Sequence, residues 1–473
     1  MKKTLKDKIS DKLVNAFLKN KIISPIPKKF TKKLTEADKF RKLCESKIKE
    51  PVIGFKVGGT GIPLMHKLKE KEPFYASIYK RNVLKSGEKV KINKSTLGIE
   101  LEVCYLIKKS YFSSKNPIIL AGNGTVRKRA SNRLRILAKN LGIGVINTFM
   151  GKGAVSKEDE HCLFTIGLGS GDFNNLAIDE SDLVIAIGYD LVEYSPSAWN
   201  RIEKGKKKII HIDYTPAEID KDYLPNVEII ADLAGALFQL NKELISKVSE
   251  KNLPLFNIKG RKKLRDAMID DLEMNNYDES FPMKPQRVLS DVRKFMEDDD
   301  IVLSDVGAHK MWVAREYNCT IPNTCLISNG FCTMGFALPG SIGAKMAFPE
   351  KKILSINGDA GFLMNVQDLE TAVRYKINIV AVVWLDGEYG LIKWKQQVHF
   401  DGEHSELRFK NPNFEFLAKS LNMWGKQIKS ANEFLPALTE AFKQDGPAII
   451  GIPIDYEENM RLTERLGKVS AII

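Results

Sequence analysis

Two short apolar runs, each followed by a glycine-rich turn that carries an aspartate, constrain the fold of this chain most. Residues 352–356 lead into Gly358 and Asp359, and residues 377–383 lead into Asp386. Both runs are rich in β-branched residues and flanked by polar ones, which is typical of buried parallel strands. Residues 366–375, between them, have helical spacing. The sequence therefore predicts a strand–turn–helix–strand unit with one carboxylate at the carboxyl end of each strand.

These two aspartates are candidates for a metal site. The carboxyl ends of parallel strands form the edge of the sheet where ligands of open α/β folds bind. Two hard oxygen donors beside a glycine-rich backbone suit Mg²⁺, which keeps several waters and takes further ligands from substrate phosphates. The pattern thus favours a metal-bridged diphosphate site. The alternative is that both aspartates only cap helices at strand–helix turns, which is a common use of Asp.

The spacing of Asp359 and Asp386, 27 residues, resembles the thiamine diphosphate (ThDP) binding signature. In that family the two side chains and a backbone carbonyl two residues past the second hold Mg²⁺. The resemblance therefore implies three metal ligands, which are Asp359, Asp386 and the carbonyl of Glu388. It also implies cofactor contacts from the surrounding residues Gly358, Ala360, Gly361 and Tyr389. Ala360 departs from the motif, which most often has Gly there, and we expect this small-for-small change to be tolerated.

Two further segments resemble the same family. Residues 328–340 look like the segment that carries the bulky residue under the thiazolium ring, and Met334 occupies that position. Its soft, unbranched side chain suits a residue that bends the cofactor. Residues 304–312 resemble the loop that contacts the diphosphate, which implies contacts from Gly307, Ala308 and His309. Amides presented to an anion give this role a physical basis. The alternative is that Met334 and His309 are core residues.

Strands also alternate with helices upstream. We expect strands at residues 116–121, 181–188 and 208–213 and a helix at 130–141, which predicts a Rossmann-like layer. Residues 187–194, with Trp199 and Asn200, resemble the central domain of acetolactate synthase, especially its catabolic, FAD-independent branch. The turn at Gly122 and Gly124 is not a full dinucleotide fingerprint. We therefore expect no FAD, with a bound flavin or nucleotide as the alternative.

The resemblance to acetolactate synthase covers residues 111–473. It implies a small 2-keto acid substrate and the joining of two pyruvates, with loss of CO2, to 2-acetolactate. The cofactor supplies the carbanion and the electron sink for this reaction. Simple 2-keto acid decarboxylation is an alternative, because Trp394 lies one residue short of the register that would indicate the acceptor.

The family also uses an activating glutamate from an N-terminal pyrimidine-binding domain, and we do not find it in residues 1–110. Three interpretations stay open. The chain is a carboligase that works as a homo-oligomer or with a partner supplying that domain, a non-catalytic ThDP-binding remnant, or a 2-keto acid hydratase-like protein.

The hydratase interpretation rests on residues 51–60 and 98–106, which resemble 2-keto-4-pentenoate hydratase of the fumarylacetoacetase-like superfamily. There a Glu-x-Glu pair on a strand, here Glu100 and Glu102, binds a divalent metal with a third carboxylate. Alternate residues of a strand share a face, so the spacing suits a second metal site. The alternative is that both glutamates are solvated on an edge strand.

Charge and cysteine content restrict the partners. The net charge is +14, but residues 1–50 alone carry 15 Lys and one Arg against three Asp and three Glu. The remainder is nearly neutral, which argues against nucleic-acid binding.

The six cysteines show no C-x-x-C pairing, which argues for reduced thiols. No apolar run reaches membrane-spanning length and no secretory leader is evident. We therefore expect a cytoplasmic enzyme without membrane contact.

The predicted fold class is α/β, with two parallel-sheet domains preceded by a truncated α+β segment. We expect the hydratase-like fragment at residues 1–110 and the Rossmann-like central domain at 111–246. A linker with a short helix is expected at 247–285, and the ThDP diphosphate-binding domain at 286–473.

Overall fold

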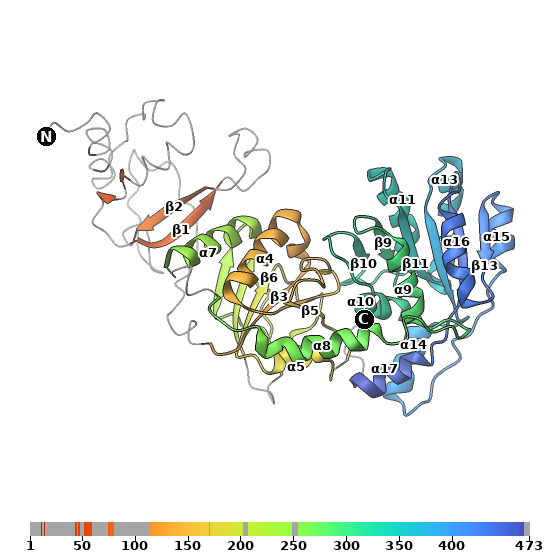
Figure 1. Cartoon of the computed structure of the whole chain (residues 1–473), viewed down its shortest axis with the longest axis horizontal. Helices are drawn as coiled ribbons and strands as arrows, with labels where there is room; N and C mark the ends of the chain where they lie inside the picture. Colours follow the sequence, from red (N-terminus) through yellow and green to blue (C-terminus); the bar gives the residue numbers. More distant parts are fainter. Residues whose placement is uncertain are drawn as a thin grey trace. The chain divides into compact units, whose positions relative to one another are not determined.

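The structure of the chain is a computed structural model. It describes residues 114–467 apart from 170, 202–206 and 248–253, with two strands and six single residues before them. The chain divides into two compact units, residues 1–108 with 230–236 and residues 109–229 with 237–473 (Figure 1). In the first unit, β1 (Val52–Gly58) pairs with β2 (Phe74–Tyr79) in antiparallel fashion. Glu100 and Glu102 lie outside the described residues.

The second unit holds two sheets of six strands each. The central sheet has the order β5-β4-β3-β6-β7-β8, so the chain moves outward from β3 in one direction and from β6 in the other. The pairs β4–β5, β3–β4, β3–β6 and β6–β7 are parallel. Its strands are β3 (Pro117–Ala121), β4 (Val145–Asn147), β5 (Cys162–Thr165), β6 (Leu183–Ile187), β7 (Lys208–Asp213) and β8 (Val227–Ile230). Its helices are η4 (Asn123–Val126), α4 (Lys128–Leu141), α5 (Phe173–Asp179), α6 (Pro196–Trp199) and α7 (Leu233–Lys247).

The C-terminal sheet is parallel, in the order β10-β9-β11-β12-β14-β13. Its strands are β9 (Ile301–Ser304), β10 (Cys325–Ile327), β11 (Ile353–Gly358), β12 (Val380–Leu385), β13 (Trp424–Gln427) and β14 (Ala448–Pro453). Its helices are α9 (Pro285–Phe295), α10 (Ala308–Glu316), α11 (Ala337–Ala347), α12 (Asp359–Met364), α13 (Asp368–Arg374), α14 (Gly390–His399), α15 (Phe414–Ser420), η7 (Ala431–Glu433), α16 (Phe434–Ala441) and α17 (Glu458–Leu466). The predicted α/β class with two parallel sheets is confirmed.

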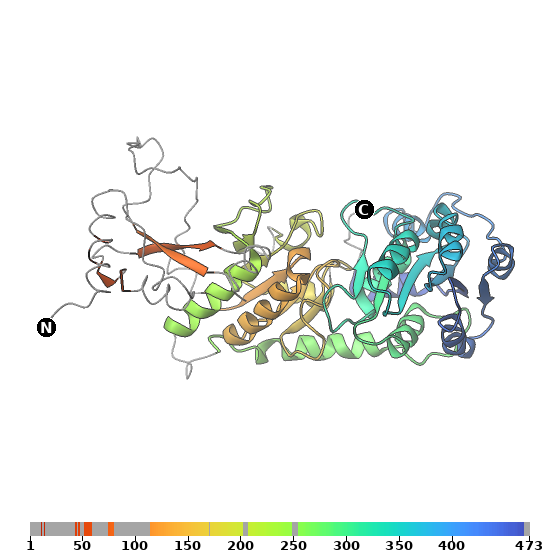
Figure 2. The same cartoon turned by 90° about the horizontal axis from the view of Figure 1, so that it is seen from above.

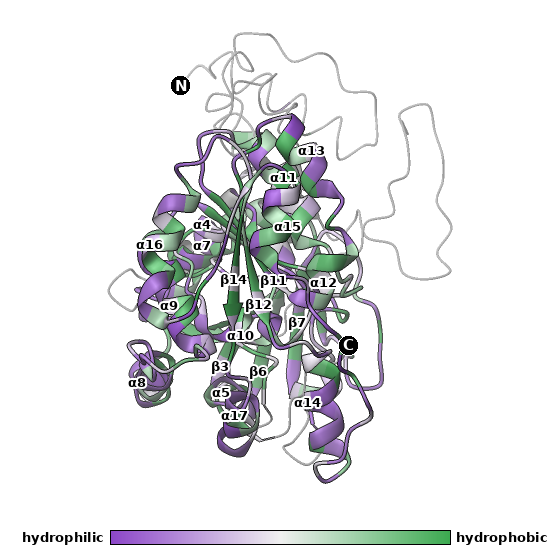
Figure 3. Cartoon of the chain, turned by 90° about the vertical axis from the view of Figure 1, so that its right-hand side faces the viewer, coloured by the Kyte–Doolittle hydropathy of each residue, from purple (hydrophilic) through white to green (hydrophobic). Residues whose placement is uncertain are grey.

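Alternation along the strands explains why both faces of this sheet are covered. Val302 and Leu354 belong to one apolar cluster and Leu303 and Ile353 to another, as expected when successive side chains point to opposite faces. Figure 3 shows the apolar strands β11, β12 and β14 with α9 and α16 on one side and α11 and α15 on the other. A parallel sheet buried on both faces needs apolar residues at consecutive positions, and this is the pattern that made the strands recognisable.

The second predicted strand begins later than expected. Residues 377–379 precede β12, and the first of them, Ile377, belongs to the end of α13. Lys376 has a left-handed backbone (φ 52), and the amide of Ile377 donates to the carbonyl of Ala372 at 2.8 Å. The amide of Lys376 donates to the carbonyl of Val373 at 3.0 Å, which completes a Schellman-type helix end.

The segment predicted as a linker with a short helix contains a longer element. Helix α8 (Lys259–Glu273) has 15 residues, buries Met268 and Leu272, and packs on α5. In the central domain, α7 lies beside α4, where Asn241 donates to the carbonyl of Arg133 at 3.1 Å (Figure 2). Among the described residues, no helix combines the length and apolar character needed to cross a bilayer.

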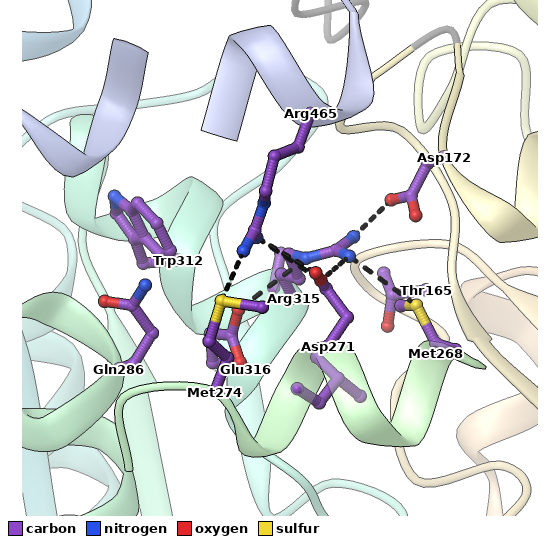
Figure 4. Close-up of polar contacts among 12 residues, drawn as sticks. Thr165, Asp172, Met268, Asp271, Met274, Gln286, Trp312, Arg315, Glu316 and Arg465 are labelled. Atoms are coloured by element: carbon purple, nitrogen blue, oxygen red, sulfur yellow. Dashed lines mark hydrogen bonds and ion pairs between the residues drawn. The ribbon is translucent and has the colours of Figure 1, made fainter. Parts of the chain in front are cut away.

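Helix α8 contributes to a buried ion cluster, shown in Figure 4. Arg315, at the end of α10, is fully buried and pairs with Asp172 of the central domain and Asp271 of α8. Arg465 of α17 reaches Asp271 at 3.1 Å, and Glu316 lies 3.6 Å from the Nε of Arg315. The cluster therefore ties three segments that are distant in sequence to one end of α10. The other end of this helix lies at the candidate site.

Candidate functional site

Three adjacent strands end at one edge of the C-terminal sheet, and the predicted site residues follow directly after them. β9, β11 and β12 are neighbours and parallel, and they lead directly into Asp305, Asp359 and Asp386. The strand order reverses beside β9, because β10 lies on one side of it and β11 on the other. Such a switch point is where open α/β sheets bind ligands.

Asp359 is the first residue of α12 and is almost fully buried, with 1% of its surface exposed. Its Oδ1 accepts a hydrogen bond from the amide of Ala360 at 2.8 Å. Its Oδ2 accepts from the amides of Asp386 at 3.1 Å and Gly387 at 2.8 Å. The structure therefore brings together the two residues that the 27-residue spacing selected.

Asp386 is partly buried and lies beside the same carboxylate. Burial and the charge of Asp359 raise the pKa of Asp386 to about 8. Two carboxyl groups in contact repel each other when both are ionised, and a divalent cation between them would remove that repulsion. Within the described ranges, no group of three or more His, Cys, Asp or Glu side chains could hold a metal ion. A metal here would thus need backbone, amide or phosphate oxygens as its other ligands.

Asn411, which the sequence analysis missed, is one such group. Its Nδ2 donates to Asp359 Oδ2 at 2.6 Å, while its Oδ1 is buried without a hydrogen-bond partner. Asp386, Gly387 and Asn411 line an open pocket at this edge. Carboxylate and carbonyl oxygens are the ligands that Mg²⁺ prefers, so the donor set fits that ion. Asn411 lies 52 residues from Asp359 in a loop, and no local pattern marks it.

The loop after Asp386 is fixed by side-chain contacts. The carboxylate of Glu388 pairs with Lys393 and, at 3.0 Å, with Arg408. These ion pairs occupy its side chain, and the role of its backbone carbonyl as a metal ligand stays a prediction. The ring of Tyr389 lies against Phe409 with centroids 5.6 Å apart. Its cofactor contact also stays a prediction.

His309 joins the segment after β9 to the segment after β11. A Cβ added at Gly307 would lie 2.6 Å from the His309 ring, and one at Gly358 would lie 3.1 Å from it. The ring therefore leaves no room for a side chain at Gly307 and little room at Gly358. Burial lowers the pKa of His309 to about 3, and nearby Lys310 adds to this. The ring is neutral, and its buried Nε2 has no hydrogen-bond partner. An unpartnered nitrogen here fits a polar ligand such as a diphosphate.

Asp305 anchors the loop that carries Met334. The side chain is fully buried and accepts from the amides of Gly335 at 3.0 Å and Phe336 at 2.9 Å. A Cβ at Gly361 would lie 2.2 Å from Asp305 Oδ2, so α12 packs on the same carboxylate. Met334, one residue before the anchored amides, is partly exposed. The sequence analysis included Asp305 only within residues 304–312. Its position directly after a strand could have marked it as a site residue.

The switch point of the central sheet is filled by the chain itself. The carboxylate of Glu193 accepts from the amide of Asn123 at 3.0 Å and from Thr148 Oγ1 at 2.5 Å. Burial raises the pKa of Glu193 to about 7. A Cβ at Gly122 would lie 2.8 Å from a Glu193 oxygen, so this glycine turn closes on a side chain. The residues from 187 to 200 that prompted the family resemblance thus serve packing, and the expectation of no FAD stays a prediction.

Comparison with known proteins agrees with this geometry. The central domain of thiamine pyrophosphate enzymes matches residues 109–240, and their C-terminal TPP binding domain matches residues 305–452. The chain carries two domains of thiamine pyrophosphate enzymes. The C-terminal match includes the strand ends that carry Asp305, Asp359 and Asp386.

Several relatives of this chain are acetolactate synthases. The chain is 31% identical over 359 residues to the acetolactate synthase of Bacillus subtilis (strain 168), which covers 75% of this chain and 62% of that protein. It is 30% identical over 362 residues to the catabolic acetolactate synthase of Raoultella terrigena, with 76% and 63% covered. It is 33% identical over 376 residues to a probable acetolactate synthase large subunit of Methanocaldococcus jannaschii, with 76% and 61% covered. The chain thus spans less than two thirds of each of these relatives.

Proposed function

We propose that this chain binds ThDP with Mg²⁺ and forms the diphosphate-binding half of an acetolactate synthase-type carboligase. The observation that carries the proposal is the contact between Asp359 and the Asp386–Gly387 turn at adjacent strand ends. Asp359, Asp386, the carbonyl of Glu388 and the unpartnered Oδ1 of Asn411 would face the metal. His309 would contact the diphosphate with its free nitrogen.

When bound, the cofactor would supply the carbanion and the electron sink for joining two pyruvates. The residues of the chain hold and shape the site. Asp305 fixes the amides of Gly335 and Phe336, and this keeps Met334 in place as the residue predicted to bend the cofactor. Helix α10, anchored at its other end by Arg315, holds His309.

We further propose that a partner chain supplies the carboxylate that activates the aminopyrimidine. The motivation is that no such glutamate is recognisable in residues 1–110, while the relatives are longer than the matched part. The N-terminal resemblance to a hydratase gives the other candidate, and a second metal site at Glu100 and Glu102 stays a prediction because both lie outside the described residues.

The test is acetolactate formation by the purified chain with ThDP, Mg²⁺ and pyruvate, measured together with ThDP binding. The expected result is Mg²⁺-dependent ThDP binding with little or no acetolactate. Robust turnover by the chain alone would refute the need for a partner carboxylate. Absence of any Mg²⁺-dependent ThDP binding would refute the proposed half-site.

A further inference from the structure

A buried lysine lies beside the residues assigned to the diphosphate. Lys310, in α10, is only 1% exposed. Its Nζ lies 3.2 Å from Asn329 Oδ1 and 3.3 Å from Cys332 Sγ, and 5.9 Å from the ring centre of Phe149. Nδ2 of Asn329 donates to the carbonyl of Glu193 at 2.7 Å, and its Oδ1 accepts from Lys310 and, at 3.8 Å, from Cys332 Sγ. The ammonium group is thus held by an amide oxygen and a cysteine sulfur.

A second lysine, Lys395, belongs to a helix that packs against α10. Lys395 of α14 is half-buried, and α14 packs against α10. Burial lowers the pKa of Lys395, and so does the positive charge of nearby Lys310. Among the residues that the structure describes, no carboxylate pairs with either lysine, although Lys393 of the same helix pairs with Glu388. The two lysines therefore lie on helices that pack together, and neither has a carboxylate partner in the described part of the chain.

A buried charge is unfavourable unless an opposite charge accompanies it. The three segments that converge here all belong to the proposed cofactor site. Lys310 follows His309, Cys332 lies two residues before Met334, and Lys395 follows the Asp386 loop by one helical turn or more. The missing anion would thus lie next to the residue expected under the thiazolium ring. This is where the reacting part of a substrate must be.

We propose that Lys310 and Lys395 form an anion subsite that holds the carboxylate of the 2-keto acid substrate. Asn329 and Cys332 orient the Lys310 ammonium group, and Lys395 closes the subsite from α14. The inference rests on the proposed function, since it takes the position of the thiazolium ring from it. An uncharged aldehyde or ketone would lack the group that these lysines recognise.

The thiol of Cys332 gives a readout that needs no cofactor. Iodoacetate is anionic and iodoacetamide is neutral, so the ratio of their alkylation rates at Cys332 reports the local positive potential. Peptide mass spectrometry separates Cys332 from the other cysteines. We expect Lys395→Gln to lower this ratio about three- to tenfold, the order of magnitude for one nearby charge in a partly buried site. Lys419→Gln, which removes an exposed lysine of α15, is the matched control and should leave the ratio unchanged.

Competing small molecules then identify the anion. Pyruvate should slow the alkylation of Cys332 in a saturable way, whereas acetone should not. Inorganic pyrophosphate tests whether the lysines serve the cofactor instead. Protection by pyrophosphate alone would overturn the assignment to the substrate, and an unchanged reagent ratio in Lys395→Gln would overturn the anion subsite itself.

Direct binding provides a second measurement. Saturation-transfer NMR on the methyl group of pyruvate should give a signal with the wild-type chain and a weaker one with Lys395→Gln. A signal of equal strength in both, or none with the wild type, would contradict the proposal. Because neither readout requires ThDP, the subsite and the proposed cofactor binding can fail independently.

Discussion

Glu316→Gln should make the protein more stable at alkaline pH while changing little at acidic pH. The ion cluster of Figure 4 contains two arginines, Arg315 and Arg465, and three carboxyl groups, so one carboxyl is in excess. Both carboxylate oxygens of Glu316 are buried without a hydrogen-bond partner, and burial raises the pKa of Glu316 to about 8. Glu316 is therefore the carboxyl that keeps its proton.

The direction in which the free energy of unfolding changes with pH follows from proton uptake on folding. In the unfolded chain this carboxyl loses its proton near its ordinary pKa of 4.5, whereas in the folded chain it holds it to about pH 8. The folded state binds more protons in this window, so the free energy of unfolding falls as pH rises from about 4.5 to about 8. The difference in pKa corresponds to about 3–5 kcal/mol over the whole window. Gln cannot ionise, so the free energy of unfolding of the variant does not fall in this way.

The assay is urea unfolding of wild type and variant, followed by far-UV circular dichroism, at about pH 5.5, 7 and 8.5. The stability difference should grow with pH in favour of Glu316→Gln by about 2–4 kcal/mol over this range. Glu370→Gln is the control, because Glu370 sits in an exposed pair with Arg374 that contributes little. A stability difference that is constant across pH, or that favours wild type at pH 8.5, would refute the reasoning.

Two other substitutions test the positions that shape the two sheets. Gly122→Ala should cost about 1–3 kcal/mol in the free energy of unfolding, because its Cβ would lie 2.3 Å from the carbonyl oxygen of Gly188; an unchanged melting temperature would contradict this. Asp305→Asn should cost about 1–3 kcal/mol and weaken ThDP binding, because an NH2 group would face one of the amides of Gly335 and Phe336. Calorimetric titration would reveal the second effect, and wild-type affinity would argue against an anchoring role.

The parts that the sequence predicted well depend on local pattern. Buried parallel strands need consecutive apolar residues, so the strands before Asp359 and Asp386 were recognisable. Since neighbouring parallel strands end at the same edge, the contact between these two aspartates followed from their order alone. The linker estimate was less accurate, because the charged surface of α8 hides Met268 and Leu272, which it buries.

The parts that were missed depend on partners distant in sequence. Asn411 reaches Asp359 across 52 residues, and Asp305 binds amides 30 and 31 residues away. Lys310 has the sequence context of an ordinary helix residue, and only the structure places it against Asn329 and Cys332. One sequence has no pattern that encodes such pairings, because each residue alone is compatible with many environments.

The most direct test of the central claim is calorimetric titration of the purified chain with ThDP, with and without Mg²⁺. We expect binding only with Mg²⁺, its loss in Asp359→Ala, and its retention in both Glu370→Gln and Glu100→Ala. Circular dichroism of each variant would show that the fold persists. Binding that is independent of Mg²⁺, or that survives in Asp359→Ala, would contradict the assignment of this strand edge as the metal–diphosphate site.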